Sequence, residues 1–230
     1  MVNIEMAGLV VSFDNKYPYI EAIAKPYLTD KKPMIFAAAD EAEIAAEQEK
    51  LSVSAGYAES VVLYSKLAEE LHRYDAFIMH AAAIELDSDV YLIAAKSGVG
   101  KTTHIKLWLD AFGERARVIN GDKPIIRKIN GEFYAAGTPW CGKERLGSTD
   151  ISKIKAVALL ERAEQSSVES LANEEAAGAL VGQLYMPKNP VSIVSSLQLL
   201  DELISRKRIV KLKANMDISA ARIAYNGMCE

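Results

Sequence analysis

The first 75 residues combine short extended pieces with two helical stretches. In residues 1–36, β-branched and aromatic residues gather between turn residues, most clearly in Gly8–Phe13 and Pro33–Phe36. This pattern predicts an antiparallel meander of strands rather than helices. The Ala/Glu-rich segment Ala37–Lys50 is compatible with a helix, although it lacks a strong apolar stripe. In Ser60–Arg73 apolar residues recur at helical spacing with charges on the other face, which predicts an amphipathic helix.

The hydrophobic period changes after residue 75. Ala76–Leu86 and Val90–Ala95 read as two strands, and the short polar turn between them predicts an antiparallel hairpin. Simple doubly wound nucleotide folds alternate strand and helix instead, so the hairpin points away from that arrangement. A helix is predicted over Lys101–Phe112, because Gly113 follows as a C-cap.

The second half of the chain mixes strands with helices. Strands are predicted at Arg117–Asn120, Pro124–Lys128, Glu132–Ala136 and Ile154–Glu161, with Asn130-Gly131 as a hairpin turn. Helices are predicted at Asn173–Leu184, Val191–Ile204 and Ser219–Tyr225, and an extended piece at Ile209–Leu212.

The composition excludes several classes of protein. Of the 230 residues, 50% are hydrophobic and 25% are charged, which excludes a disordered or fibrous chain. The 27 basic and 31 acidic residues give a net charge of −4, so we expect no nucleic-acid partner. The longest apolar stretch, Ala76–Leu86, contains His80 and is far shorter than the roughly 20 residues of a membrane helix. We therefore expect no membrane association.

The termini and the cysteines indicate a cellular compartment. The N-terminus lacks a basic region and carries Glu5 where a signal peptide would be apolar. The two cysteines, Cys141 and Cys229, cannot form a disulfide framework and lack the spacing of a zinc site. These features predict a cytoplasmic protein.

The segment AKSGVGKTT, residues 95–103, is the most informative part of the sequence. It follows a predicted strand and opens a predicted helix, which is the context of a Walker A loop. Gly98 and Gly100 allow backbone N–H groups to converge on phosphate oxygens at the positive end of the helix. Lys101 supplies a charge to the β- and γ-phosphates, and the Thr102 hydroxyl is the expected Mg²⁺ ligand. Ala95 stands in the place of the first glycine of the pattern, which alanine can fill if its φ stays negative.

This segment predicts a nucleotide site. A Gly-rich turn before an ordinary helix is the alternative, but a lysine in the first turn opposes the helix dipole. The predicted nucleotide-binding residues are Ser97, Gly98, Val99, Gly100, Lys101, Thr102 and Thr103.

Together with Met79–Ala83 and the hairpin that follows, the loop resembles HPr kinase/phosphorylase and its bacterial phosphoenolpyruvate carboxykinase-like relatives. The similarity continues through the segments Thr103–Trp108, Phe112-Gly113, Val118–Pro124, Gly137–Lys143 and Leu159–Arg162. The similarity is specific over about residues 76–162 and only loose over the rest of the chain.

The resemblance implies an α/β fold, with a P-loop nucleotide-binding core, a mixed β-sheet of the HPr kinase/phosphoenolpyruvate carboxykinase type and an N-terminal β-rich part. It implies one domain over residues 1–230. Within that domain, an N-terminal β/α portion covers 1–75, the core covers 76–162 and a C-terminal helical portion covers 163–230.

The resemblance also implies site residues outside the loop. His80 matches a histidine near the reacting centre, although a histidine in an apolar strand is more often a core residue. Asp122 matches the second of two aspartates and would hold Mg²⁺ together with Thr102, whereas Gly121 replaces the first aspartate. A polar turn is the alternative for Asp122. Lys143 and Arg145 lie in a glycine-rich segment and could neutralise charge on the transferred phosphoryl group.

The predicted function is that of a kinase that uses ATP and Mg²⁺ to phosphorylate a hydroxyl group of a protein, a peptide or a small molecule. The alternative is an ATP-binding regulatory protein without turnover, because Ala95 and Gly121 depart from the family pattern. A carboxykinase-type reaction would need further metal- and carboxylate-binding residues, for which the sequence shows no equivalent set. The N-terminal 75 residues and the C-terminal helices present the substrate or build a homo-oligomer, and the sequence leaves both open.

Overall fold

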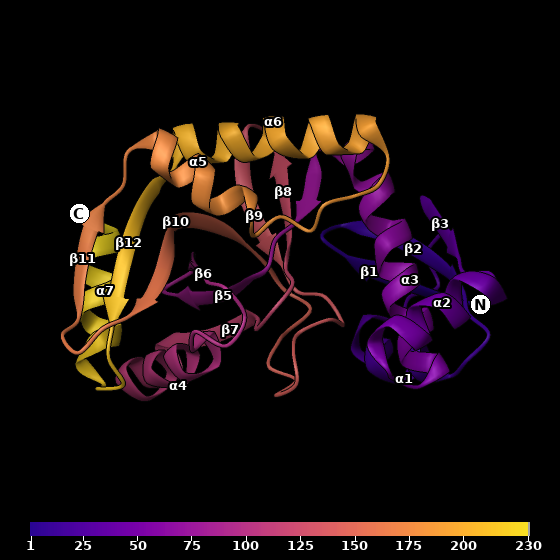
Figure 1. Cartoon of the computed structure of the whole chain (residues 1–230), viewed down its shortest axis with the longest axis horizontal. Coiled ribbons are helices and arrows are strands. Elements are labelled where there is room, and N and C mark those ends of the chain that lie inside the picture. Colours follow the sequence, from indigo (N-terminus) through magenta and orange to yellow (C-terminus); the bar gives the residue numbers. More distant parts are fainter. Residues whose placement is uncertain (230) are drawn as a thin grey trace.

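The computed structural model describes residues 1–229 as an α/β protein with a curled mixed sheet and a smaller separate sheet (Figure 1). Its helices are α1 Tyr19–Ala24, α2 Glu41–Leu51, α3 Ala55–Glu70, α4 Lys101–Phe112, α5 Asn173–Val181, α6 Pro190–Arg206 and α7 Ser219–Cys229. Its strands are β1 Val2–Met6, β2 Leu9–Asp14, β3 Ile35–Ala38, β4 Ala76–Ile78, β5 Ala81–Leu86, β6 Asp89–Ala94, β7 Ala116–Asn120, β8 Ile125–Ile129, β9 Glu132–Ala136, β10 Ile151–Arg162, β11 Ser167–Ser170 and β12 Arg208–Ala214. Short 3₁₀ turns follow α1, α3 and α4, at Lys25–Tyr27, Leu71–Tyr74 and Gly113–Arg115.

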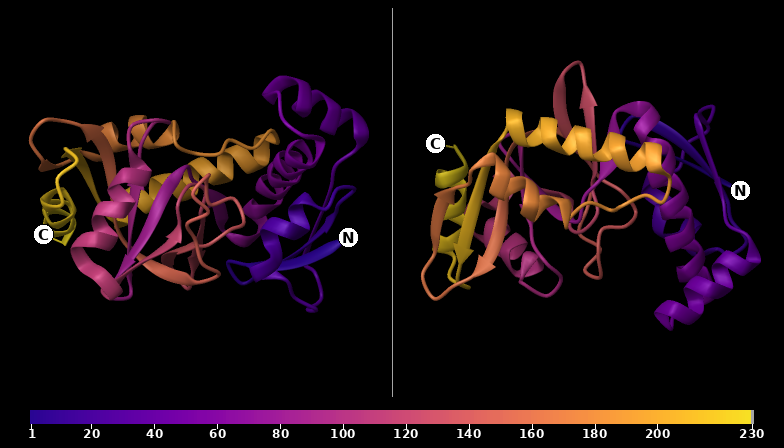
Figure 2. Two further views of the ribbon diagram at one scale, coloured as in Figure 1. Left: turned by 90° about the horizontal axis from the view of Figure 1, so that it is seen from below. Right: turned by 45° about the horizontal axis from the view of Figure 1, so that its top comes forward.

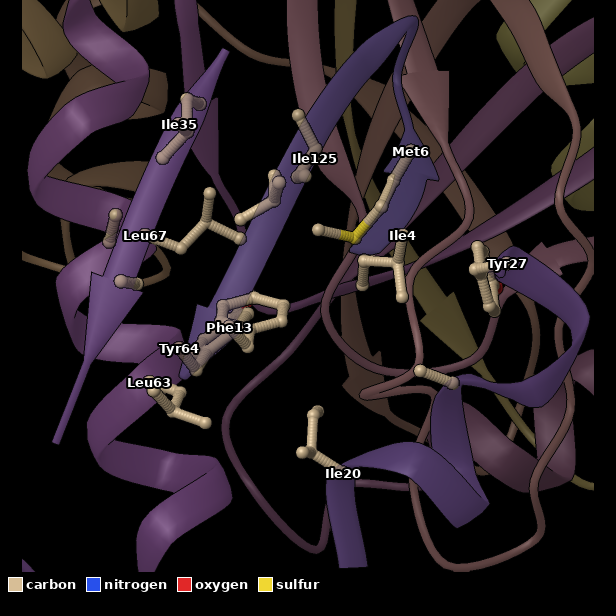
Figure 3. Packing of buried hydrophobic residues seen from close by; sticks show 14 of the residues in the cluster. Ile4, Met6, Phe13, Ile20, Tyr27, Ile35, Leu63, Tyr64, Leu67 and Ile125 are labelled. Atoms are coloured by element: carbon tan, nitrogen blue, oxygen red, sulfur yellow. The ribbon is translucent and has the colours of Figure 1, made fainter. Parts of the chain in front are cut away.

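The N-terminal part forms a separate small sheet covered by helices. β1 and β2 form an antiparallel hairpin whose turn residues, Ala7 and Gly8, both have positive φ. β3 then pairs with β2 in parallel, after the chain has passed through α1. Figure 3 shows how Ile4 and Phe13 of this sheet pack with Leu63 of α3 in one buried cluster.

The large sheet is organised around the long strand β10. One edge of β10 pairs in parallel with β6, and its other edge pairs first with β9 and then with β12. Beyond β6 the order continues to β5 and β7, and beyond β9 it continues to β8 and β4. Because two strands share one edge of β10, the sheet branches there and curls.

Helices cover both faces of the large sheet. α4 packs against β5, β7 and α7, and α7 packs against β10, β11 and β12. On the other face, α5 packs against α6, which runs along the sheet to the end of α3 (Figures 1 and 2). The Ser192 hydroxyl of α6 donates to the Glu69 carbonyl of α3 and so joins this helix to the N-terminal part.

Four parallel strands end at one edge of the sheet. β6, β10 and β12 are mutually parallel, and β7 has the same direction because β5 is antiparallel to both β6 and β7. The segments after these strands, and the segment before β5, therefore meet at this edge. Open α/β sheets bind ligands at the carboxyl ends of their strands, and this edge carries the candidate site.

Most predicted elements are present, with four differences. The stretch Ala76–Leu86 is two strands, because β4 pairs with β8 whereas β5 pairs with β6 and β7. The N-terminal pieces are not an antiparallel meander, since α1 interrupts them and β3 is parallel to β2. α3 begins at Ala55, where Ser54 accepts a hydrogen bond from the Tyr57 N–H as N-cap. The C-terminal residues also contain β11, which was not predicted, whereas the predicted extended piece Ile209–Leu212 lies within β12 and joins the large sheet. Across residues 1–229, none of the helices has the length and apolar character needed to cross a lipid bilayer.

Candidate functional site

The site begins at the glycine loop, defined as residues 95–100, between β6 and α4. Gly98 and Gly100 have φ values of +80° and +121°, which side chains with a Cβ rarely adopt. Ala95 is buried and does not have positive φ, so alanine fits the place where the pattern has glycine. Among the described residues, no acceptor is found for the backbone N–H groups of Gly98, Gly100 and Lys101. Free N–H groups at a helix start form an anion site.

Three side chains from three segments meet beside this loop. The Lys101 ammonium, in the first turn of α4, lies 3.0 Å from His80 Nε2 and donates to the Ala95 carbonyl at 3.0 Å. His80 Nε2 also lies 3.1 Å from Asp122 Oδ1. With a proton, Nε2 donates a hydrogen bond to Asp122, and without one it accepts a hydrogen bond from Lys101. The position of the ring proton therefore decides which of the two residues His80 bonds.

The pKa values of Lys101 and Asp122 are both lowered, for different reasons. Lys101 is only 8% exposed, and burial lowers its pKa. Burial by itself raises the pKa of Asp122, but the hydrogen bond from His80 and the charge of Lys123 outweigh it and lower that pKa to about 2. The Lys123 ammonium forms an ion pair with the other carboxylate oxygen. Asp122 is therefore an anion held among two lysines and a histidine.

The turn that carries Asp122 is fixed by Asn120. The fully buried Asn120 amide donates to Thr138 Oγ1 at 3.0 Å, and its oxygen accepts from the backbone N–H groups of Asp122 and Lys123. Asn120 is thus engaged within the protein and does not reach a ligand. At Gly121 an added Cβ would lie 2.9 Å from the Cys141 carbonyl oxygen. Close backbone packing, and not a positive φ, leaves no place at position 121 for the first of the two aspartates that the resemblance implied.

These groups face a cleft of about 850 Å³. Ser97, Thr102 and Thr103 line it beside Lys101, and Lys143 and Arg145 line it from the exposed segment after β9. Within residues 1–229 neither Lys143 nor Arg145 forms an ion pair. The cleft thus brings together all the predicted site residues except Val99. Val99 instead lines a second cavity behind the loop.

The opposite wall of the cleft comes from the N-terminal part, which the sequence did not assign to the site. Tyr19 of α1 and Tyr57 of α3 pack edge to face at 5.6 Å between ring centroids, and both line the cleft with Ser60. Trp140 also lines it and packs against Tyr64 of α3, with ring centroids 4.6 Å apart. No local motif marks Tyr19, Tyr57 and Ser60, because long-range packing of the N-terminal part brings them to the cleft.

Two further cations were also missed. Arg162, the last residue of β10, donates to the carbonyls of Gly98 at 2.5 Å and Val99 at 2.8 Å and so fixes the glycine loop. Lys123 follows Asp122 directly, and this adjacency is the only sequence feature that could have assigned it to the site. The parallel pairing of β10 with β6 brings Arg162 to the loop, and strand order is not readable from hydrophobic periodicity.

Other titratable residues near the site have different roles. Burial raises the pKa of the Cys141 thiol, which disfavours the reactive thiolate. His72 contacts the Glu69 carbonyl and Ser192 Oγ, away from the cleft. No group of three or more His, Cys, Asp or Glu side chains suited to a metal ion occurs in the described part of the chain.

Comparisons with known proteins give a distant likeness to solved structures and no sequence match. No protein-family model and no curated protein sequence matches the chain. Among solved structures, the Hpr(Ser) kinase/phosphatase from Coxiella burnetii is similar over 65% of this chain and 94% of that chain, with a TM-score of 0.39 and 10% sequence identity. The function proposed below therefore rests on the geometry of the site.

Proposed function

We propose that the chain is an Mg²⁺- and ATP-dependent phosphotransferase that transfers the γ-phosphoryl group to a hydroxyl. The observation that carries this proposal is the position of Lys101. It lies at the start of α4, after a loop with two positive-φ glycines, and within 3.0 Å of His80, which in turn contacts Asp122. Free N–H groups, a lysine and a neighbouring carboxylate are the parts that phosphoryl transfer needs.

ATP would lie with its phosphates on the glycine loop. The N–H groups of Gly98, Gly100 and Lys101 would bind phosphate oxygens, and the Lys101 ammonium would exchange the Ala95 carbonyl for a phosphate oxygen. Lys143 and Arg145 would reach the outer phosphates from the facing segment. ATP binding would thus replace the contact between Lys101 and the Ala95 carbonyl of the loop.

The donor set fits a magnesium ion held mainly by the nucleotide. Mg²⁺ in such sites takes one or two protein oxygens together with phosphate oxygens and water. The Thr102 hydroxyl and the Asp122 carboxylate both line the cleft and would be those protein ligands. When bound, the ion neutralises charge that develops on the phosphates. The Lys123 ammonium, which pairs with Asp122, would then be released to a phosphate oxygen.

The transfer itself needs mainly positioning. The acceptor hydroxyl oxygen forms a bond to the γ-phosphorus while the bond from that phosphorus to the bridging oxygen breaks, and ADP leaves. Asp122 is the carboxylate at the cleft beside His80, and it would accept the hydroxyl proton. Since its pKa of about 2 makes it a weak base, orientation and charge neutralisation would supply most of the rate.

The proposal treats residues 1–230 as one functional domain in which the N-terminal portion, 1–75, forms the acceptor side. Tyr19, Tyr57 and Ser60 line the cleft across from the glycine loop. The acceptor is a hydroxyl of a protein, a peptide or a small molecule that enters between these walls.

The test is a transfer assay with γ-labelled ATP and Mg²⁺, run with the full chain, with water and with a panel of hydroxyl acceptors. We expect ADP release or labelled acceptor in the parent protein and a loss of at least about a hundredfold in Lys101→Ala and Asp122→Asn. Lys96→Ala is the matched control, because Lys96 is an exposed lysine of the same loop, and it should keep its rate. Equal rates in Lys101→Ala and Lys96→Ala would contradict the proposal.

A second candidate function is a nucleotide-binding protein without turnover. The observation that favours it is the packing at Gly121, which leaves one carboxylate where the family pattern has two. Saturable, Lys101-dependent ATP binding with no transfer across the whole acceptor panel would select this function.

A further inference from the structure

A second cavity, of about 380 Å³, lies on the other side of the glycine loop from the cleft. It is built from the loop, α4 and the ends of β10 and β12, at the same edge of the sheet. Gly100, Thr103 and Arg162 line both cavities. A ligand on the loop can therefore extend from the cleft into the second cavity without leaving the protein surface.

The two cavities differ in chemistry. The cleft carries the cations Lys101, Lys123, Lys143 and Arg145. The second cavity is lined mainly by apolar side chains, namely Val99, Leu107, Leu160, Ala163, Ala214 and Met216. Its one cation among the described residues, Arg162, already donates to two loop carbonyls. A ligand that joins a polyanionic part to a flat apolar part matches this division.

His104 lines the second cavity and carries a buried donor without a partner. His104 is 2% exposed, and its Nε2 accepts a hydrogen bond from Trp108 Nε1 at 3.0 Å. The indole N–H is only a donor, so Nε2 carries no proton and the neutral ring has its N–H at Nδ1. Within residues 1–229 this N–H has no partner. Heterocyclic bases carry ring nitrogen and carbonyl acceptors that satisfy such a donor.

We propose that the second cavity binds the nucleobase and ribose of the nucleoside triphosphate whose phosphates lie on the glycine loop. This inference rests on the proposed function and deepens it, because it makes the phosphoryl donor a nucleotide and not a base-free polyphosphate. Leu107, Leu160 and Met216 would cover the faces of the base. The cationic cleft would then bind the phosphates and the acceptor.

The test compares magnesium-bound ATP with magnesium-bound tripolyphosphate by titration calorimetry on the full chain. Ala163→Trp places an indole in the second cavity from a half-buried position after β10. We expect it to weaken ATP binding at least about tenfold and to leave tripolyphosphate binding within about twofold. Tyr57→Ala, on the wall of the cleft, is the control and should leave the preference for ATP over tripolyphosphate unchanged. ATP binding that withstands Ala163→Trp but falls in Tyr57→Ala would overturn the inference.

Photolabelling of the unmodified chain with 8-azido-ATP gives a second readout that needs no variant to fold. Crosslinks on peptides that contain Leu107 or Met216 are expected, and crosslinks on Tyr19, Tyr57 or Trp140 would place the base in the cleft instead. Lys101-dependent tripolyphosphate binding without tighter binding of ATP would overturn this inference alone. If neither ligand bound in a Lys101-dependent way, the proposed function and this inference would both fail.

Discussion

Asp122 is an anion that the fold itself stabilises. Its carboxylate contacts His80 and Lys123, and its pKa is lowered to about 2. The unfolded chain has an ordinary aspartate pKa of roughly 4, so it binds more protons than the folded chain between these values. The contribution of Asp122 to stability is therefore complete above about pH 4 and is lost as the pH falls toward 2.

Asp122→Asn should consequently lower the free energy of unfolding by up to about 2 kcal/mol at pH 6 in metal-free buffer. The difference should shrink as the pH falls from 4 toward 2, where the two proteins should converge, because the protonated acid and the amide are both neutral. Urea unfolding at pH 6, 4 and 3 measures the difference. A constant difference across this range would show that the carboxylate charge is not stabilised by His80 and Lys123.

Gly121 is fixed by backbone packing. An added Cβ would lie 2.9 Å from the Cys141 carbonyl oxygen and 3.1 Å from the Leu146 carbonyl oxygen. Gly121→Ala should destabilise the protein by roughly 1–3 kcal/mol. Gly178→Ala is the matched control, since Gly178 lies within α5 with nothing within 4 Å of its added Cβ, and it should stabilise by about 0.5–1 kcal/mol. Equal effects in chemical denaturation would mean that Gly121 has room for a side chain.

At the scale of the element, α4 carries a histidine held neutral inside the core. Burial lowers the pKa of His104 to about 4. An unfolded histidine has a pKa of roughly 6.5, so the unfolded state binds more protons between pH 6.5 and 4. Stability should fall by up to about 3 kcal/mol over that interval as the pH decreases.

His104→Gln removes this titration and offers the Trp108 N–H an amide oxygen as acceptor in place of Nε2. We expect the variant to show a smaller loss of unfolding free energy between pH 7 and 4.5 than the parent protein. Parallel curves for the two proteins would mean that His104 is accessible to protons in the folded state.

The elements that the sequence predicted well are those with local signals. The hairpin between β5 and β6 turns at Asp87 and Ser88, both with positive φ, and the hairpin between β8 and β9 turns at Asn130-Gly131. The break at Met79-His80 was missed, because every side chain around it is apolar. It exists because His80 N–H donates to the Gln183 carbonyl at 2.7 Å, a partner 103 positions away. Pairing partners, and not the pattern within the segment, decide where β4 ends and β5 begins.

The contrast between local signals and long-range contacts also applies to the site residues. The glycine loop and Lys101 are contiguous with a strand and a helix, so spacing alone predicted them. His80 and Asp122 came from the resemblance to a family, and the structure places them 3.1 Å apart. The position of Arg162 depends on strand order, and the positions of Tyr19 and Tyr57 depend on how the N-terminal part packs. No local sequence pattern encodes either.

At the scale of the whole molecule, the N-terminal part and the large sheet share one core. Ile78 of β4 and Ile125 of β8 belong to the same buried cluster as Ile4 and Phe13. Figure 3 shows Ile125 beside the strands of the small sheet. The Tyr27 hydroxyl donates to the Ser148 carbonyl at 2.7 Å, and Arg127 donates to the Ala7 carbonyl at 2.7 Å. This continuity predicts a single cooperative unfolding transition.

Trp140 reports on this junction, because it packs between Phe13 and Tyr64. In a Trp108→Phe background it is the only tryptophan of the chain. Its fluorescence and the far-ultraviolet circular dichroism should follow the same urea transition. A fluorescence change at lower urea would show that the N-terminal part separates before the large sheet unfolds.

The most direct measurement of the central claim is the thermal stabilisation by Mg-ATP of the parent protein, Lys101→Met and Lys96→Met. A ligand at about 100 times its Kd stabilises the folded state by about 2.7 kcal/mol. Binding of the phosphates by the glycine loop predicts that the increase in Tm occurs in the parent protein and in Lys96→Met and is absent in Lys101→Met. The same increase in both lysine variants would contradict the assignment of the loop as the phosphate site.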